Sequence, residues 1–388
     1  MPVQRSTTRR FTLDGSDFLE RRLALVCERA ANGVAKLIPS VQLEGLLLAG
    51  GYGRGEGGVL REASGDRPYN DLEFYVFARG NALVAERRYA AALHALGAGL
   101  TPAAGLEVEF KLLTLNKLRR SRSSMFYYDL MLGRRWLVGD DSLLAGCEHH
   151  SDAAAIPLQE ATRLLMNRCS GLLFSSERLH RGRFGPDEAD FVGRNLAKAQ
   201  LAFGDVWLTA HGQYHWSCLE RHKRLARLEA SDASTLCEAI QAHHAAGVAF
   251  KLHPVRSKEP RERLAQRHAE LSELGNRLWL WLESRRLGIP FASTRAYAMS
   301  HTNKCPETSP YRNLLVNGRT FGLGAAFGSA GTAYPRQRLL HALCLLLWEK
   351  STTADSALLW RARSELNTRA ASFAGLVSAY EQLWHRFN

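Results

Sequence analysis

Two acidic residues, Asp71 and Glu73, are separated by one residue at the start of a run that is otherwise mostly apolar. Successive side chains of a β-strand point to opposite faces, so a strand here would place both carboxylates on one face. Neighbouring carboxylates repel each other unless a cation neutralises them. Mg²⁺ takes oxygen ligands and keeps coordination positions for substrate phosphates. The pair therefore indicates a metal site for phosphoryl chemistry; the simpler interpretation is two solvated carboxylates at a strand end.

A glycine-rich turn precedes the acidic pair and directly follows an apolar run at residues 46–49. Glycine lets the backbone bend sharply and approach a ligand without a clash of Cβ atoms. Backbone amides and a guanidinium in such a turn can bind phosphate oxygens. The spacing matches neither the Walker A pattern nor the dinucleotide-binding fingerprint. The residues of this turn predicted to bind nucleotide are Gly50, Gly51, Gly53 and Arg54.

Further acidic residues occur in the segment 107–113, where polar and apolar residues alternate before the sequence turns apolar. The alternation predicts a strand with Glu107 and Glu109 on its polar face. An edge strand with a solvated charged face is an equally simple interpretation. If this strand lies next to the one that carries Asp71 and Glu73, three carboxylates would meet. Such a group can hold two metal ions for in-line displacement at phosphorus.

The order of these features resembles the nucleotidyltransferase superfamily with the DNA polymerase β-type fold, including its members that modify small molecules such as antibiotics. Members of that superfamily carry an apolar strand, a Gly-Gly or Gly-Ser turn that opens a helix, an Asp-x-Asp/Glu strand and a third acidic residue on a later strand. The resemblance covers residues 40–145. It implies an α+β fold, in which a small mixed β-sheet with helices is followed by a mainly α-helical domain.

The resemblance also implies an activity: Mg²⁺-dependent transfer of an NMP group from an NTP, expected to be ATP, to an acceptor hydroxyl, with release of pyrophosphate. Two Mg²⁺ ions would be held by the acidic residues, and Glu107 best matches the third carboxylate, with Glu109 as its competitor. In the helical region, Lys198 would hold a phosphate, although a surface position is the simpler interpretation. The residues carried over are catalytic Asp71, Glu73 and Glu107; metal-binding Asp71, Glu73, Glu107 and Glu109; and nucleotide-binding Gly50, Gly51, Gly53, Arg54 and Lys198.

The segment between the glycine turn and the acidic pair, residues 52–70, is longer than is usual in that superfamily. Residues 61–70 are polar and contain Gly and Pro, so they predict a loop insertion. Loops accept such additions at little entropic cost. We therefore expect the turn and the acidic pair to meet despite the insertion.

The chain has 388 residues, of which 46% are hydrophobic, enough for two domains. We predict a catalytic domain at 1–150 that begins with a helix, and a helical acceptor- or nucleotide-binding domain at 151–388 with an irregular segment at 288–334. The net charge is +13, and most of the positive excess follows residue 150. A basic second domain would attract triphosphate or a phosphorylated acceptor; solvated helix faces are an equally good interpretation. Helical spacing predicts helices at 16–38, 117–133, 158–179, 186–209, 217–244, 260–286, 335–350 and 355–386.

The seven cysteines are scattered singly, without a Cys-x-x-Cys pair, which is typical of a protein in a reducing compartment. The N-terminal segment is polar, and no apolar run is long enough for a membrane helix. We therefore expect a cytoplasmic protein without a membrane partner.

Two other functions fit parts of the sequence. A catalytically silent relative could bind nucleotide or protein for regulation, although every acidic position is filled. A template-independent RNA nucleotidyltransferase would use the basic helical half, but no RNA-binding module is recognisable, so nucleic acid is not the expected partner. The expected acceptor is a small molecule or a protein side chain.

Overall fold

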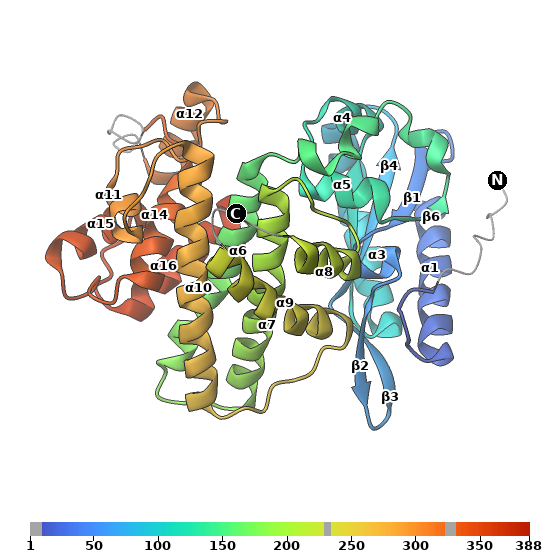
Figure 1. The fold of residues 1–388 in the computed structure, drawn as a ribbon. Coiled ribbons are helices and arrows are strands. Elements are labelled where there is room, and N and C mark those ends of the chain that lie inside the picture. The colour runs from blue at the N-terminus through green and yellow to red at the C-terminus, as the bar shows by residue number, and fades with distance from the viewer. Residues whose placement is uncertain (1–9, 229–233, 323–330) are drawn as a thin grey trace. The chain divides into compact units, whose positions relative to one another are not determined.

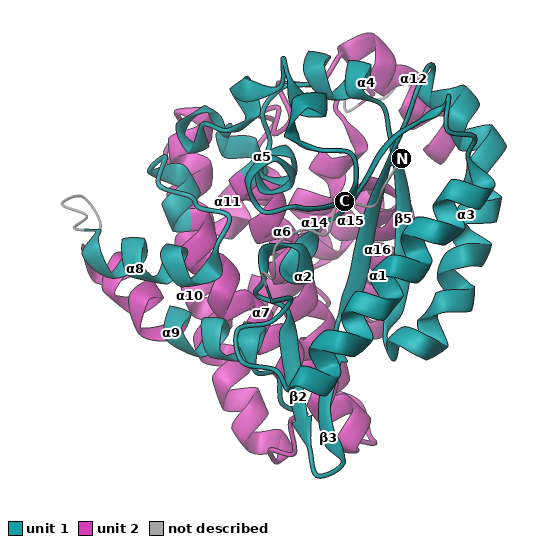
Figure 2. Ribbon diagram, turned by 90° about the vertical axis from the view of Figure 1, so that its right-hand side faces the viewer, with its two compact units in different colours: residues 1–160, 207–228, 244–255 teal, residues 161–206, 229–243, 256–388 magenta. Residues whose placement is uncertain are grey.

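The computed structural model describes residues 10–228, 234–322 and 331–388 (Figure 1). The chain is α+β, with a small mixed sheet in its first part and helices through the rest. It divides into two compact units (Figure 2). The first comprises residues 1–160, 207–228 and 244–255, and the second comprises residues 161–206, 229–243 and 256–388. The first unit thus extends beyond the predicted boundary at residue 150 and takes in two later segments.

Four strands form the sheet in the order β5-β4-β1-β6. Their bounds are β1 (Leu43–Leu48), β4 (Asp71–Ala78), β5 (Glu107–Leu113) and β6 (Arg135–Val138). β1 is antiparallel to β4 and β6, whereas β4 and β5 are parallel. Because β1 and β4 run in opposite directions, the end of β1 lies beside the start of β4, where Leu48 pairs with Phe74. The Ala49 amide then donates a hydrogen bond to the Glu73 carbonyl at 2.9 Å, which brings the glycine turn to the acidic pair.

The two faces of the sheet pack against different helices. Alternate residues of β4, such as Phe74 and Val76, join a core with residues of α1 (Asp17–Leu37) and α3 (Ala82–Ala104). The residues between them, Tyr75 and Phe77, pack instead with α4 (Leu115–Arg120) and α5 (Met125–Leu132). Asp71 and Glu73 precede Tyr75 at even spacing and share its face, as the sequence predicts.

The segment predicted as a loop insertion is a β-hairpin. β2 (Gly58–Glu62) and β3 (Gly65–Tyr69) pair antiparallel between α2 (Gly50–Arg54) and β4. The hydroxyl of Tyr52 donates to the Gly58 carbonyl at 2.8 Å and accepts from the Tyr69 amide at 2.7 Å, which fixes both ends of the hairpin. The outer part of the hairpin is exposed, so polar residues are tolerated there and the alternation that marks a half-buried strand is missing.

Helices make up most of the remaining structure, with short 3-10 turns η1 (Asp141–Leu144), η2 (Glu148–His150) and η3 (Ala153–Ala155). Their bounds are α6 (Leu158–Leu179), α7 (Pro186–Ala210), α8 (Cys218–Arg227), α9 (Ser234–Leu252), α10 (Arg261–Leu287), α11 (Thr294–Met299), α12 (Pro310–Phe321), α14 (Pro335–Trp348), α15 (Ser356–Leu366) and α16 (Phe373–Phe387). No helix of this described part is both long and apolar enough to cross a membrane.

The predicted helices at 16–38, 158–179, 186–209 and 260–286 are confirmed to within two residues at each end. The prediction of a single helix at 117–133 is wrong, because this segment contains the two helices α4 and α5. Ser124 begins α5 as its N-cap, and its hydroxyl accepts a hydrogen bond from the Tyr127 amide at 3.2 Å. The predictions for 217–244 and 355–386 likewise each merge two helices. The segment predicted as irregular, 288–334, contains α11 and α12; residues 323–330 lie outside the described residues.

A buried lysine lies in the second unit. Lys304 is 1% exposed, and its ammonium lies 4.4 Å from the ring centroid of Tyr297 and 4.8 Å from that of Phe291. Its Nζ donates to the hydroxyl of Ser300 at 2.5 Å. Burial lowers the pKa of Lys304 to about 8, against the opposing charge of Glu283.

We expect the lowered pKa of Lys304 to make the free energy of unfolding depend on pH. Its folded pKa lies below its unfolded one, so the burial penalty is fully present below about pH 8 and disappears as pH rises toward about 10.5. Relative to a Lys304→Met variant, the free energy of unfolding of the wild type should rise by about 1–2 kcal/mol between about pH 7 and pH 9.5. Urea titrations at both pH values measure it, and a constant difference between the two proteins would contradict it.

Candidate active site

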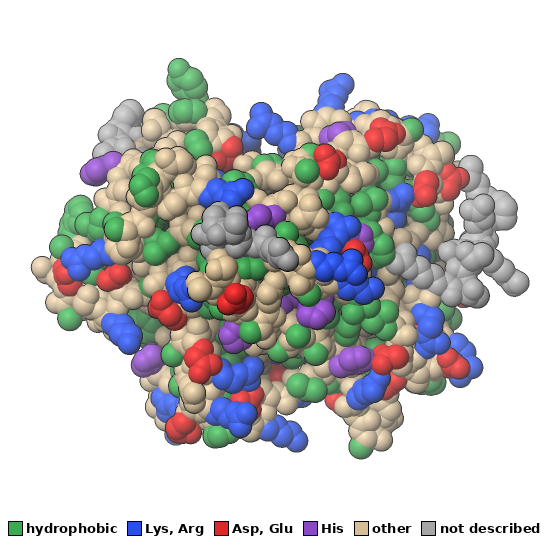
Figure 3. All heavy atoms as spheres, viewed as in Figure 1, with side chains coloured by type: hydrophobic (Ala, Val, Ile, Leu, Met, Phe, Trp, Pro, Cys, Tyr) green, Lys and Arg blue, Asp and Glu red, His purple; other side chains and the backbone are tan. Residues whose placement is uncertain are grey.

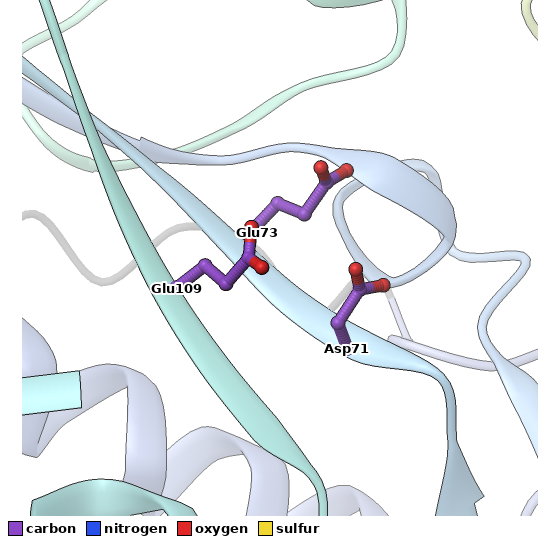
Figure 4. A group of neighbouring side chains, drawn as sticks. All are labelled: Asp71, Glu73 and Glu109. Atoms are coloured by element: carbon purple, nitrogen blue, oxygen red, sulfur yellow. The ribbon is translucent and has the colours of Figure 1, made fainter. Parts of the chain in front are cut away.

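Three carboxylates converge on one face of the sheet (Figure 4). Asp71 and Glu73 extend from β4 and Glu109 from the neighbouring β5, and one oxygen from each lies within 4.8 Å of the others. The parallel register of the strands pairs Glu73 directly with Glu109, which explains their proximity. An all-oxygen donor set with partial exposure to solvent fits Mg²⁺, which prefers carboxylates and keeps several water or phosphate ligands.

The third carboxylate is that of Glu109, and we call Asp71, Glu73 and Glu109 the acidic cluster. In the described part of the chain, Glu107 does not belong to this cluster. Glu107 lies two residues earlier on the same face of β5, in register with Asp71, and is exposed. Alternation along a strand fixes which face a residue occupies but not which partner lies opposite it. A catalytic role for Glu107 stays a prediction.

Charge in the acidic cluster is only partly balanced by the protein. The Nζ of Lys111 lies 2.8 Å from Oε1 of Glu73 and 2.9 Å from Oε2 of Glu109. Burial lowers the pKa of Lys111, but the hydrogen bonds to the two glutamates outweigh it, and the pKa is raised. Burial and the charges of Glu73 and Glu109 raise the pKa of Asp71. Additional positive charge beside Asp71 would therefore be favourable.

The glycine turn lies directly against the acidic cluster. Gly50 has a left-handed backbone with φ of +64°, and a Cβ atom there would lie 3.0 Å from Oε2 of Glu73. A Cβ atom on Gly51 would lie 3.3 Å from Nζ of Lys251. The turn and the acidic pair therefore meet, as the sequence predicts. Gly53 serves packing, because a Cβ atom at that position would lie 2.3 Å from the carbonyl oxygen of Leu48.

Lys251 is the residue of this site that sequence reasoning missed. It lies on α9 in the part of that helix that belongs to the first unit. Burial lowers the pKa of Lys251, as does the charge of Arg54, whereas Asp71 opposes the shift. No motif surrounds Lys251 in the sequence, and only the fold brings it to the glycine turn. Its charge lies where a triphosphate beside Gly51 would need it.

Arg54 points to a partner within the protein. Its guanidinium donates to Oδ2 of Asp129 at 2.7 Å and to the Trp216 carbonyl at 3.1 Å, and its side chain is 11% exposed. Burial lowers the pKa of Arg54, but the charge and hydrogen bond of Asp129 together with the charge of Tyr214 outweigh it, and the pKa is raised. In the structure Arg54 braces the turn against α5 and the segment before α8, and its contact with phosphate stays a prediction.

Glu56 forms a second brace at the end of the glycine turn. Its carboxylate is 5% exposed and accepts hydrogen bonds from Oγ of Ser217 at 2.5 Å and from the Cys218 amide at 2.9 Å. Burial raises the pKa of Glu56, but the hydrogen bonds from Ser217 and Cys218 outweigh burial. The pKa of Glu56 is therefore below its ordinary value. Arg54 and Glu56 explain why residues 207–228 belong to the first unit.

Two basic features of the helical region were expected to matter for binding. Lys198 lies half-buried on α7 in the second unit, and its contact with nucleotide stays a prediction. Basic side chains gather over α8, which presents Lys223, Arg224 and Arg227, whereas its Arg221 is buried (Figure 3). Because α8 belongs to the first unit, part of the positive excess lies in the same unit as the acidic cluster.

Comparisons with protein-family models and with curated proteins find no match to this chain. The features of the site that bear on its function are the acidic cluster, the glycine turn against it and the half-buried Lys251 beside that turn.

Proposed function

We propose that this protein is a Mg²⁺-dependent nucleotidyltransferase that moves an NMP group from an NTP, with ATP as the expected donor, to an acceptor hydroxyl and releases pyrophosphate. One observation carries the proposal. Carboxylate oxygens of Asp71, Glu73 and Glu109 lie within 4.8 Å of one another beside the glycine turn. The turn is so close that a Cβ atom on Gly50 would lie 3.0 Å from Oε2 of Glu73.

Asp71, Glu73 and Glu109 are the residues that would hold Mg²⁺, in one or two ions. When bound, the metal supplies charge neutralisation at the transferring phosphoryl group and at the leaving pyrophosphate. The protein holds the three carboxylates close together on two adjacent strands. Their mutual repulsion, which raises the pKa of Asp71, would be relieved by a bound cation.

The other residues of the site receive the substrates. Gly50 and Gly51 leave the room that side chains would fill, so phosphates can lie against the turn. Lys251 provides positive charge beside them. The attacking hydroxyl must lose its proton as its oxygen bonds to the α-phosphorus, and we assign that proton to Glu107, which is exposed on the face of the acidic cluster. The expected acceptor is a small molecule or a protein side chain.

Lys251→Met is expected to weaken the binding of MgATP by about tenfold, because the positive charge beside Gly51 would be lost. Isothermal titration at fixed Mg²⁺ measures the dissociation constant. A Lys36→Met variant, which removes an exposed lysine of α1, is the matched control and should bind as the wild type does. Unchanged affinity in the Lys251 variant would remove this residue from the nucleotide site.

The proposed function is tested by incubating the protein with labelled NTPs, Mg²⁺ and a cell lysate. Mass spectrometry then identifies any molecule that has gained the mass of a nucleoside monophosphate. We expect one acceptor class to be labelled by the wild type, and no labelling by an Asp71→Asn variant or after chelation. Absence of a nucleotidylated product, together with absence of MgATP binding, would refute the proposal.

A catalytically silent nucleotide-binding protein is the second candidate function. The observation that favours it is the position of Lys111, whose ammonium already bridges Glu73 and Glu109 and neutralises part of the acidic cluster. Binding of MgATP without transfer to any acceptor would decide for this alternative.

A further inference from the structure

We propose that Lys111 is a built-in competitor of the metal: its ammonium occupies the cation position between Glu73 and Glu109 and must leave when Mg²⁺ binds. This inference rests on the proposed function, because it concerns the same acidic cluster. It assigns to Lys111 the regulation of the site: free metal is disfavoured, and metal that arrives with nucleotide phosphates is favoured.

The geometry of Lys111 carries the first step. The residue follows Glu109 at even spacing on β5 and lies in register with Tyr75, so it shares the face of the acidic cluster. Its ammonium binds two of the three carboxylates, at 2.8 Å and 2.9 Å. Within the described residues it forms no ion pair with Asp71, the remaining carboxylate. A cation that used all three acids would have to take the place of this ammonium.

Exposure and the neighbouring ring show that Lys111 is able to leave. Its side chain is 44% exposed, so the ammonium can reach solvent by rotation of its own flexible stem. The ring centroid of Tyr75 lies 5.8 Å from Nζ, within the range of a cation–π contact, so the ring also faces this ammonium. Lys111 therefore blocks the site reversibly.

The charges give the functional consequence. Three carboxylates and one ammonium leave the cluster with a net negative charge, but a dication that enters must break two ion pairs and then repels the displaced ammonium. Metal bound to a triphosphate brings phosphate oxygens, which can accept that ammonium. Free Mg²⁺ has no such compensation, so Lys111 makes binding of metal and nucleotide cooperative.

The test is a titration with MnCl₂, in which free Mn²⁺ is followed by electron paramagnetic resonance. Lys111→Met should bind Mn²⁺ about tenfold more tightly than the wild type in the absence of nucleotide, because one competing positive charge is gone. Lys117→Met, which removes an exposed lysine of α4, is the matched control and should bind as the wild type does. Asp71→Asn added to Lys111→Met should remove the tight binding.

The outcomes separate this inference from the proposed function. Equal Mn²⁺ affinity in the wild type and Lys111→Met overturns the role of Lys111 and leaves the metal site standing. Absence of Mn²⁺ binding in both proteins, also when ATP is present, overturns both proposals. Weaker binding in Lys111→Met would show that the lysine supports the site instead of competing with metal, and it also overturns the inference.

A second measurement uses the wild type alone and does not depend on the folding of a variant. Reductive methylation with formaldehyde, read by mass spectrometry of peptides, reports how available each lysine is. Addition of saturating Mn²⁺ without nucleotide should increase the labelling of Lys111 several-fold and leave Lys117 unchanged. Labelling of Lys111 that does not change, in protein shown to bind Mn²⁺, would contradict the displacement.

Discussion

Replacement of Asp71 by Asn is expected to reduce NMP transfer by about a thousandfold or more while the protein remains folded. Asparagine keeps the size of the side chain but cannot neutralise a cation. In the described structure Lys111 forms ion pairs with Glu73 and Glu109 and none with Asp71, the third acid of the cluster. The rate of incorporation of labelled NMP into the identified acceptor measures the effect.

The stability of the Asp71→Asn variant separates catalysis from folding. Burial and repulsion by Glu73 and Glu109 raise the folded pKa of Asp71, so its ionised form destabilises the protein above that pKa, and the penalty is absent in acid, where the carboxyl is protonated. At neutral pH the variant should therefore unfold at the same temperature as the wild type or at a higher one. A Glu86→Gln variant on the exposed side of α3 is the control for both readouts. Full transfer activity in Asp71→Asn would refute the metal site.

Replacement of Glu109 by Gln is expected to reduce transfer by about a hundredfold to a thousandfold and to weaken Mn²⁺ binding by about tenfold or more. Glu109 supplies the carboxylate of β5 to the acidic cluster, and its loss also removes one of the two partners that hold Lys111. Activity assays and Mn²⁺ titrations on the same preparations measure the two effects.

The matched comparison is Glu107→Gln, because Glu107 has the same side chain and lies two residues away on the same face. It lies outside the acidic cluster, so Mn²⁺ binding should be unchanged. If Glu107 accepts the proton of the attacking hydroxyl, as we propose, the rate should fall by about tenfold to a hundredfold. If Glu107→Gln abolishes metal binding and Glu109→Gln does not, the assignment of the two glutamates is reversed.

The strands and the faces of this site were predictable because they depend on local periodicity. Alternation placed Asp71 and Glu73 on one face, and the apolar run before residue 50 ended where β1 ends. The choice between Glu107 and Glu109 was not predictable, because the register of β4 against β5 depends on how the strands and helices pack together.

Contacts between residues that are distant in sequence could not be predicted either. Lys251 and Asp129 are distant in sequence from the glycine turn, and only the tertiary structure shows that one brings charge to the turn while the other engages Arg54. The sequence predicts that Arg54 contacts phosphate because a guanidinium in a glycine-rich turn can bind phosphate oxygens. Its ion pair with Asp129 makes it a residue that positions the turn.

The hairpin of β2 and β3 offers an attachment point that is mechanically insulated from the chemistry. Both of its ends are fixed by the hydroxyl of Tyr52, whereas Ala63 and Ser64 at its tip are exposed. Insertions at that tip change the length of an exposed turn and leave the entry into β4 where it is. An affinity tag can be grafted there to immobilise the protein on a surface while Asp71 and Glu73 keep their positions.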